Sequence, residues 1–198
     1  MPNDDTTPRP KIVKLTRESM RTGLSRLDEI AKAGGRRIEL VIYGSGAIIL
    51  TCDTFQRTTK DIDATYNNDE FIKNAINRIA EEFGFDERWL NNAIQPFHPP
   101  TFGIVPSDMF VPDENGCGLV VKFASKELLV AMKCMAFDDP FRRHDFDDLE
   151  YLIRHLGLTS VDEVLKIVRT YYPDDPLPKN LVLGIETILD CIAEESDP

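Results

Sequence analysis

The sequence has no long apolar run, no closely spaced pair of cysteines and no excess of basic charge. No segment approaches the roughly 18 consecutive apolar residues of a membrane span, so we expect no contact with a membrane. The first residues, MPNDDTTPRPK, lack the apolar stretch of a secretory signal, so we expect no export. The four cysteines are scattered without a CxxC motif, which is typical of a reduced, cytoplasmic protein.

Several catalytic motifs are also absent. The chain contains no Walker loop, no HExxH zinc motif and no GxSxG nucleophile elbow, and its three histidines are isolated from one another. The formal net charge is −11, so extensive non-specific binding of nucleic acid is not expected. A metal–nucleotide substrate stays compatible with this charge, because a divalent cation screens the phosphates.

The most informative stretch runs from Val41 to Tyr66. The apolar segment 38–43 predicts a strand, and residues 46–52 predict the start of a short helix. Gly44, Ser45 and Gly46 would join the two elements. Glycines let a ligand approach the backbone closely, and the first turn of a helix offers unpaired N–H groups to a phosphate. The turn therefore predicts an anion site, to which the Ser45 hydroxyl would add a hydrogen bond.

Two carboxylates follow this turn. Asp61 and Asp63 are separated by Ile62, and alternate residues of a strand lie on the same face, so both carboxylates should point one way while Ile62 enters the core. Adjacent carboxylates repel each other, and a divalent cation is the simplest partner for them. The pair therefore predicts a Mg²⁺ or Mn²⁺ site beside the anion site. The residues leave open a plainer alternative, a glycine turn next to an acidic strand edge.

This stretch resembles the nucleotidyltransferase superfamily, which has the fold of DNA polymerase beta. The matching features are Gly44-Ser45 followed by Asp61-x-Asp63, and the run from Arg57 to Asp63 is similar more narrowly to the AbiEii and DUF6036 branch. The resemblance implies that Asp61 and Asp63 hold the metal. It also implies a set of nucleotide-binding residues, namely Gly44, Ser45, Gly46, Arg57, Thr59 and Lys60. Many members of this branch are toxins of bacterial toxin–antitoxin or phage-defence pairs, which implies an antitoxin protein as a partner.

The rest of the pattern predicts an α+β fold with a small mixed sheet, flanking helices and a C-terminal helical bundle. Besides the strand at 38–43, we expect strands within 57–66 and near 109–111 and 119–124, with loop at 96–108. Helices are expected at about 16–33, 69–83 and 86–95, the last carrying Trp89 as a packing anchor. We therefore divide the chain into a core, residues 1–124 with a loose tail at 1–11, and a helical part, residues 125–198, packed on it.

A second group of charged residues lies in the helical part. Lys133 has apolar residues one helical turn away on both sides, and Asp145 and Asp148 lie at the edge of the apolar stripe of the next helix. A carboxylate on a buried side needs a cation. The group has two interpretations, a helix–helix ion pair or part of an active site. The lysine and the motif RRHDFDDLEYL resemble the AbiEii and DUF6036 pattern, which implies that Lys133 and Asp145 or Asp148 complete the catalytic site with Asp61 and Asp63.

One feature departs from that pattern. Enzymes of this fold usually carry a third carboxylate on a later strand, and the segment 119–124 offers only Lys122. Either the third ligand is missing, or Asp145 and Asp148 substitute for it. The resemblance implies metal-dependent transfer of a nucleoside monophosphate from a nucleoside triphosphate to a hydroxyl of an RNA, a protein or a small molecule. The alternative function is that of a catalytically degenerate member of the fold, which acts as a binding module.

Overall fold

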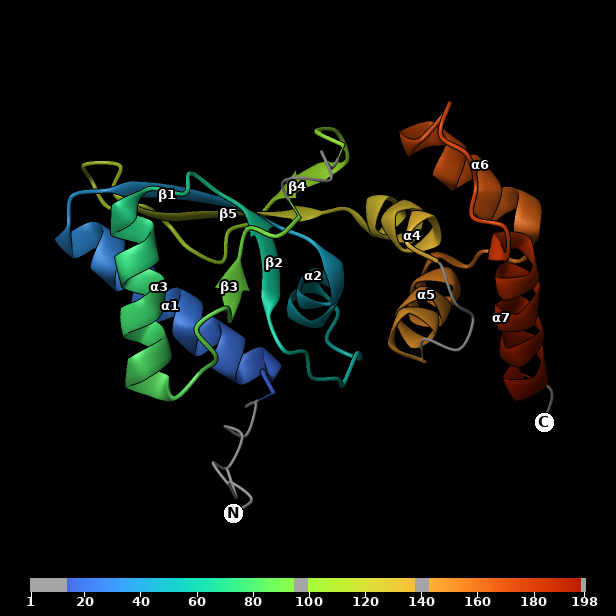
Figure 1. The fold of residues 1–198 in the computed structure, drawn as a ribbon, viewed down its shortest axis with the longest axis horizontal. Coiled ribbons are helices and arrows are strands. Elements are labelled where there is room, and N and C mark those ends of the chain that lie inside the picture. The colour runs from blue at the N-terminus through green and yellow to red at the C-terminus, as the bar shows by residue number, and fades with distance from the viewer. Residues whose placement is uncertain (1–13, 95–99, 138–142, 197–198) are drawn as a thin grey trace, which may run out of the picture.

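The fold is organised around a five-stranded mixed sheet (Figure 1). The structure, a computed structural model, describes residues 14–94, 100–137 and 143–196. The strands are β1 (Arg37–Ile42), β2 (Ile62–Thr65), β3 (Leu90–Asn91), β4 (Ile104–Pro106) and β5 (Gly118–Ala124), in the order β3-β2-β1-β5-β4. β1 pairs antiparallel with β2 and parallel with β5, and the short β3 runs parallel to β2. The predicted mixed sheet is confirmed.

Three helices from the first half of the chain lie on one side of this sheet (Figure 1). They are α1 (Arg17–Ala33), α2 (Gly44–Thr51) and α3 (Glu70–Phe83). Alternation in β1 accounts for this arrangement, because Ile38, Leu40 and Ile42 are buried while its odd-numbered residues are exposed or half-buried. The buried Asp28 carboxylate of α1 accepts a 2.8 Å hydrogen bond from the backbone N–H of Leu119, which fixes α1 against β5.

The caps of these helices follow the local sequence. The Thr16 hydroxyl accepts a 3.1 Å hydrogen bond from the Ser19 N–H, and the Ser19 hydroxyl accepts a 2.8 Å hydrogen bond from the Thr16 N–H, so α1 begins where the pattern predicts. Asp69 caps α3 by accepting a 3.1 Å hydrogen bond from the Ile72 N–H. Gly84 ends α3 in the left-handed conformation at φ 68°, which a glycine adopts without a steric penalty. The helices at 16–33 and 69–83 are thereby confirmed.

The second half of the chain is helical, as predicted. It contains α4 (Lys126–Met135), α5 (Arg143–Leu156), α6 (Val161–Tyr171) and α7 (Leu181–Ser196). α4 follows β5 directly, contacts α2, and packs against α5 and α6 (Figure 1). The division at residue 125 stays a prediction. Within the described parts of the chain, no helix is both long and apolar enough to cross a membrane.

Two predictions of secondary structure are wrong. The described part of 86–95 is a turn followed by β3, because the Ile62 N–H donates to the Trp89 carbonyl at 2.7 Å and pairing with β2 overrides the local helical pattern. Trp89 is nevertheless a packing anchor, since it is fully buried and its Nε1 donates to the Ile76 carbonyl at 3.1 Å. The strand expected at 109–111 lies instead at 104–106, within the segment predicted as loop, where pairing with β5 stabilises it.

Candidate active site

Asp61 and Asp63 stand at the start of β2 on either side of the fully buried Ile62, as the alternation predicts. Burial raises the pKa of the Asp61 carboxyl, and repulsion from Asp63 raises it further. Burial also raises the pKa of Asp63. Among the described residues neither carboxylate forms an ion pair, and Arg88 and Lys133 act on Asp63 only at longer range. The pair therefore lies in a partly buried place without a neutralising cation.

The glycine turn lies directly against this pair. The Tyr43 N–H donates to the Asp63 carbonyl at 2.9 Å, which brings the end of β1 next to β2. Gly44 begins α2 with φ 60°, and a Cβ added there would come within 3.3 Å of Asp63 Oδ2. A side chain at this position would be strained by the backbone conformation and crowded by the carboxylate, and a glycine avoids both. The predicted anion site and the predicted metal site are therefore adjacent.

Asn91 is a site residue to which the sequence assigned no role. It lies on β3 opposite Asp63, and its Nδ2 donates to Asp61 Oδ2 at 3.1 Å. Its Oδ1 accepts from the Ala93 N–H at 2.9 Å, which fixes the orientation of the amide. The hydrogen bonds from Asn91 lower the pKa of both carboxyls, against the effect of burial. The strand β3 thus carries an amide beside the two carboxylates. It supplies no third carboxylate.

The two carboxylates fit a single divalent cation. In the described ranges no group of three or more His, Cys, Asp or Glu side chains is placed to hold a metal ion. One or two carboxylates are the usual protein ligands of Mg²⁺, which takes its other ligands from water and substrate phosphates. Asp61 and Asp63 supply such a donor set, and burial raises the pKa of both carboxyls, so a bound cation would stabilise their charged forms.

Asn91→Ala is expected to weaken Mg²⁺ binding about tenfold, because residues that orient metal ligands typically contribute that much. Loss of the amide would also free the Asp61 carboxylate to rotate. Calorimetric titration of Mg²⁺ measures the change, with Asn77→Ala on the exposed side of α3 as the matched control. Equal affinity in Asn91→Ala and the wild type would show that Asn91 has no role in positioning the carboxylates.

Lys133 lies between two carboxylates of α5. Its Nζ is 2.7 Å from Asp145 Oδ1 and 2.8 Å from Asp148 Oδ2, so both candidate aspartates lie within ion-pair distance. Burial alone would lower the pKa of Lys133, but the charge of Asp148 and the hydrogen bonds to both aspartates outweigh it, so the pKa is raised. The lysine is therefore firmly cationic, and it lies near enough to lower the pKa of Asp63 through its charge.

Asp148 is the centre of this network. Its side chain is 1% exposed, its Oδ1 accepts from Arg57 Nη1 at 2.9 Å, and its Oδ2 accepts from the Ser45 hydroxyl. Ser45 Oγ is also 3.4 Å from Lys133 Nζ. Three of the residues assigned to the nucleotide or to catalysis are thus held by one buried carboxylate. The neighbouring Asp147 is half exposed, and its Oδ2 is 3.5 Å from Arg57 Nη1.

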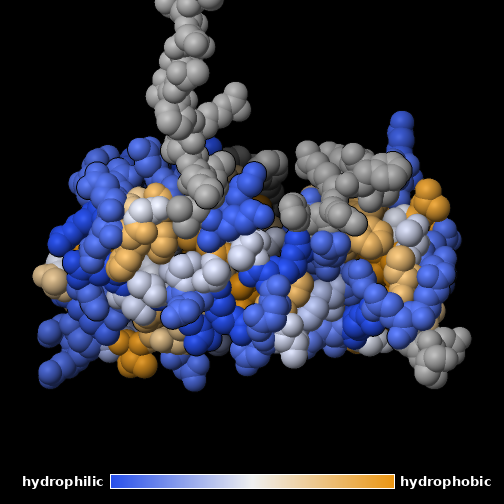
Figure 2. Space-filling model, turned by 90° about the horizontal axis from the view of Figure 1, so that it is seen from below, coloured by the Kyte–Doolittle hydropathy of each residue, from blue (hydrophilic) through white to orange (hydrophobic). Residues whose placement is uncertain are grey.

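A cavity of about 510 Å³ is lined by members of both groups, although the described residues Asp63 and Lys133 do not line it. Three acidic residues, Asp61, Asp145 and Asp148, line it together with Ser45 and the segment 57–60. The predicted residues Arg57, Thr59 and Lys60 therefore share one cavity with the carboxylates, whereas Gly44 and Gly46, also among the described residues, do not line it. The segment between α2 and β2 lies on the lower side of Figure 1, and the face seen from below is largely hydrophilic (Figure 2).

Comparison with known proteins gives one match. Residues 22–99 match the model of a family described as a nucleotidyltransferase of unknown function (DUF6036). This range contains the glycine turn, the segment 57–63 and Asn91, and it ends before Lys133 and α5. Searches among curated proteins and among solved structures found no match.

Proposed function

On the premise that residues 22–99 are those of a nucleotidyltransferase-like family, we propose that the protein transfers a nucleoside monophosphate from a nucleoside triphosphate to an acceptor hydroxyl. The observation that carries the proposal is the carboxylate pair, Asp61 and Asp63, partly buried without an ion pair among the described residues and in contact with the glycine turn. A purely structural acidic strand edge would be expected at the surface, where water solvates both charges.

Each residue has a defined part in this reaction. Asp61 and Asp63 would hold Mg²⁺ or Mn²⁺, which when bound supplies positive charge to the α-phosphate and the attacking oxygen. The acceptor oxygen attacks the α-phosphorus, its proton passes to a carboxylate of the pair, and pyrophosphate leaves. A carboxylate positioned beside the attacking oxygen can act as a general base. Lys133, held by Asp145 and Asp148, keeps a positive charge near the reacting phosphate.

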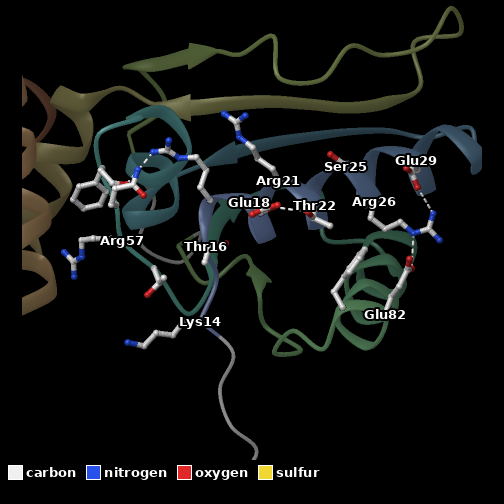
Figure 3. Close-up of a pocket in the computed structure, with 15 residues that line it drawn as sticks. Lys14, Thr16, Glu18, Arg21, Thr22, Ser25, Arg26, Glu29, Arg57 and Glu82 are labelled. Carbon is white, nitrogen blue, oxygen red and sulfur yellow. Dashed lines mark hydrogen bonds and ion pairs between the residues drawn. The ribbon is translucent and has the colours of Figure 1, made fainter.

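A second hollow gives the acceptor a route to the cavity. It has a volume of about 1260 Å³ and follows the exposed side of α1 (Figure 3). Four residues, Lys14, Phe55, Arg57 and Thr58, line both this hollow and the cavity. An acceptor lying along α1 would therefore reach the cavity at Arg57. The acceptor in this proposal is an RNA end, a protein side chain or a small molecule.

The test is a labelling reaction. Nucleoside triphosphates labelled at the α-phosphate should transfer label to a macromolecule in a cell extract with Mg²⁺, whereas those labelled at the γ-phosphate should not. A kinase would show the reverse. The wild type is compared with Asp61→Ala, which removes one metal ligand and should abolish labelling. Transfer from the γ-phosphate, or equal labelling by the two proteins, would refute nucleotidyl transfer at this site.

One observation favours the second candidate, a degenerate member of the fold that acts as a binding module. The strand β5, where the third carboxylate was expected, carries none, and the strand beside β2 carries the amide of Asn91. Absence of labelling together with absence of stabilisation by any nucleotide would favour this candidate. A toxin role in the cytoplasm, with an antitoxin partner, is part of the primary proposal. A neighbouring gene for a small DNA-binding protein would support it.

A further inference from the structure

Two lysines lie opposite each other beside the candidate active site. Leu15 and Thr59 form an antiparallel bridge in which the Leu15 N–H donates to the Thr59 carbonyl at 2.7 Å and the Thr59 N–H to the Leu15 carbonyl at 3.0 Å. In such a pair the next residues along, here Lys14 and Lys60, are directly opposite, with Cα atoms about 4.5 Å apart in regular pairing. Both lysines are exposed, and both line the cavity that contains Asp61.

This juxtaposition is unfavourable for the protein alone. Like charges directly opposite each other on paired strands are destabilising. In the described parts of the chain, neither Lys14 nor Lys60 forms an ion pair that would offset the repulsion, although the protein has 34 acidic residues and a net charge of −11. Arg57 adds a third cation to the same cavity, and Figure 3 shows Lys14 and Arg57 at the same end of the hollow along α1. A bound anion would offset the repulsion between the two lysines.

The bridge fixes the position of both lysines. Leu15 is fully buried, and Thr16 caps α1, so Lys14 is held at the start of α1 and not on a loose segment. Lys60 immediately precedes Asp61, the first carboxylate of the pair. Lys60 therefore lies next to the carboxylate pair, and Lys14, which lines both the cavity and the hollow along α1, lies where the two meet.

We propose that Lys14 and Lys60 together bind the β- and γ-phosphates of the nucleoside triphosphate, the part that leaves as pyrophosphate. This inference rests on the proposed function. It also changes the expected phosphate site, since the Ser45 hydroxyl donates to Asp148 and Lys133 is bonded to two carboxylates. The Ser45 hydroxyl of the glycine turn and the Lys133 ammonium of α4 thus already have partners within the protein. Lys14 and Lys60 have no ion-pair partner among the described residues and are placed to bind a ligand.

Binding of inorganic tripolyphosphate in the presence of Mg²⁺ tests the lysine pair without any reaction. Calorimetry should show affinity about tenfold weaker for Lys14→Ala and for Lys60→Ala, because each variant removes one charge-assisted contact to phosphate. Binding of Mg²⁺ alone should be unchanged. Lys166→Ala, which removes an exposed lysine of α6, is the matched control and should bind like the wild type.

The variant Lys14→Glu tests the repulsion between the two lysines. Its melting temperature without ligand should be higher than that of the wild type, because a cross-strand attraction replaces a repulsion. It should also lose tripolyphosphate binding, because a negative charge replaces a positive one. Unchanged tripolyphosphate affinity in both alanine variants, or a lower melting temperature of Lys14→Glu, would overturn the proposal. Label transfer distinguishes failure of the lysine phosphate site from failure of the proposed function. A protein that binds tripolyphosphate through the lysines but transfers no label would support the phosphate site and contradict nucleotidyl transfer.

Discussion

Asp63→Asn is expected to abolish label transfer while making the metal-free protein more stable at neutral pH. Loss of one metal ligand removes several kcal/mol of charge stabilisation from the transition state, which corresponds to a decrease in rate of about a thousandfold. The same change relieves the repulsion that raises the pKa of Asp61, so the folded state gains stability. Opposite effects on activity and stability are typical of a functional carboxylate and not of a structural one.

The pH dependence of stability follows from the same shifts. Burial, with repulsion from Asp63 at Asp61, raises the folded-state pKa of both carboxyls above the ordinary value of 3.8. Protonated carboxyls therefore favour the folded state, and this contribution is complete below the unfolded-state pKa and is lost as the pH rises through the folded-state pKa. At neutral pH the metal-free protein lacks this stabilisation. Mg²⁺ should therefore raise the melting temperature at neutral pH and have little effect at acidic pH.

Thermal unfolding with and without Mg²⁺, at neutral and acidic pH, measures these effects for the wild type and Asp63→Asn. Asp190→Asn, on an exposed position of α7, provides a control for the loss of one surface carboxylate. The control should retain both the activity and the stabilisation by Mg²⁺. A wild type that Mg²⁺ fails to stabilise at neutral pH, or an Asp63→Asn protein that unfolds at a lower temperature without metal, would contradict the metal assignment.

The parts of the fold that depend on local signals could be predicted from the sequence. Thr16 caps α1 at the predicted start of that helix, and Gly84 ends α3 directly after the predicted range 69–83. The spacing of Asp61 and Asp63 indicated a shared face of a strand, since that geometry is set within three residues. Lys133 and its two aspartates were also predicted as a group, because their places on two amphipathic helices follow from the helical period.

The parts that depend on distant pairing could not be predicted. The strand β3 has only two residues, and pairing with β2 sets its position. Because the local pattern of this segment is typical of a helix, the sequence did not indicate that Asn91 lies beside Asp61 and Asp63. Lys14 was missed for a related reason, because a single bridge between Leu15 and Thr59 places it opposite Lys60. Nothing in the segment around Lys14 alone indicates a partner, and the local pattern of 86–95 favours the wrong element.

Asp148→Ala is expected to destabilise the protein by about 3–5 kcal/mol, the cost typical of removing one partner from a buried ion pair. The Asp148 side chain is 1% exposed and lies 2.8 Å from Lys133 Nζ and 2.9 Å from Arg57 Nη1. Its removal leaves the Lys133 ammonium, which is 13% exposed, with Asp145 as its remaining carboxylate partner among the described residues. For a chain of this size the expected decrease in melting temperature is roughly 10 °C.

Chemical and thermal denaturation measure this loss. Asp147→Ala is the matched control, because Asp147 is the neighbouring residue, is 46% exposed and lies 3.5 Å from the same Arg57 atom. We expect the control to change stability by less than about 0.5 kcal/mol, as exposed ion pairs contribute little. Similar stability of the Asp148→Ala and Asp147→Ala proteins would show that the network around Asp148 does not contribute to the fold.

The double variant Lys133→Met/Asp148→Ala separates the two interpretations of this network. Removing the lysine together with its buried partner eliminates the Lys133 charge, while Asp145 and Arg57 each lose one partner, so the double variant should recover part of the stability lost in Asp148→Ala. Label transfer is then measured on a folded protein. If transfer returns with stability, Lys133 and Asp148 form a helix–helix ion pair without a catalytic role. If transfer stays absent while Mg²⁺ binding is retained, the pair acts on the nucleotide, as its distance of 3.4 Å from Ser45 favours.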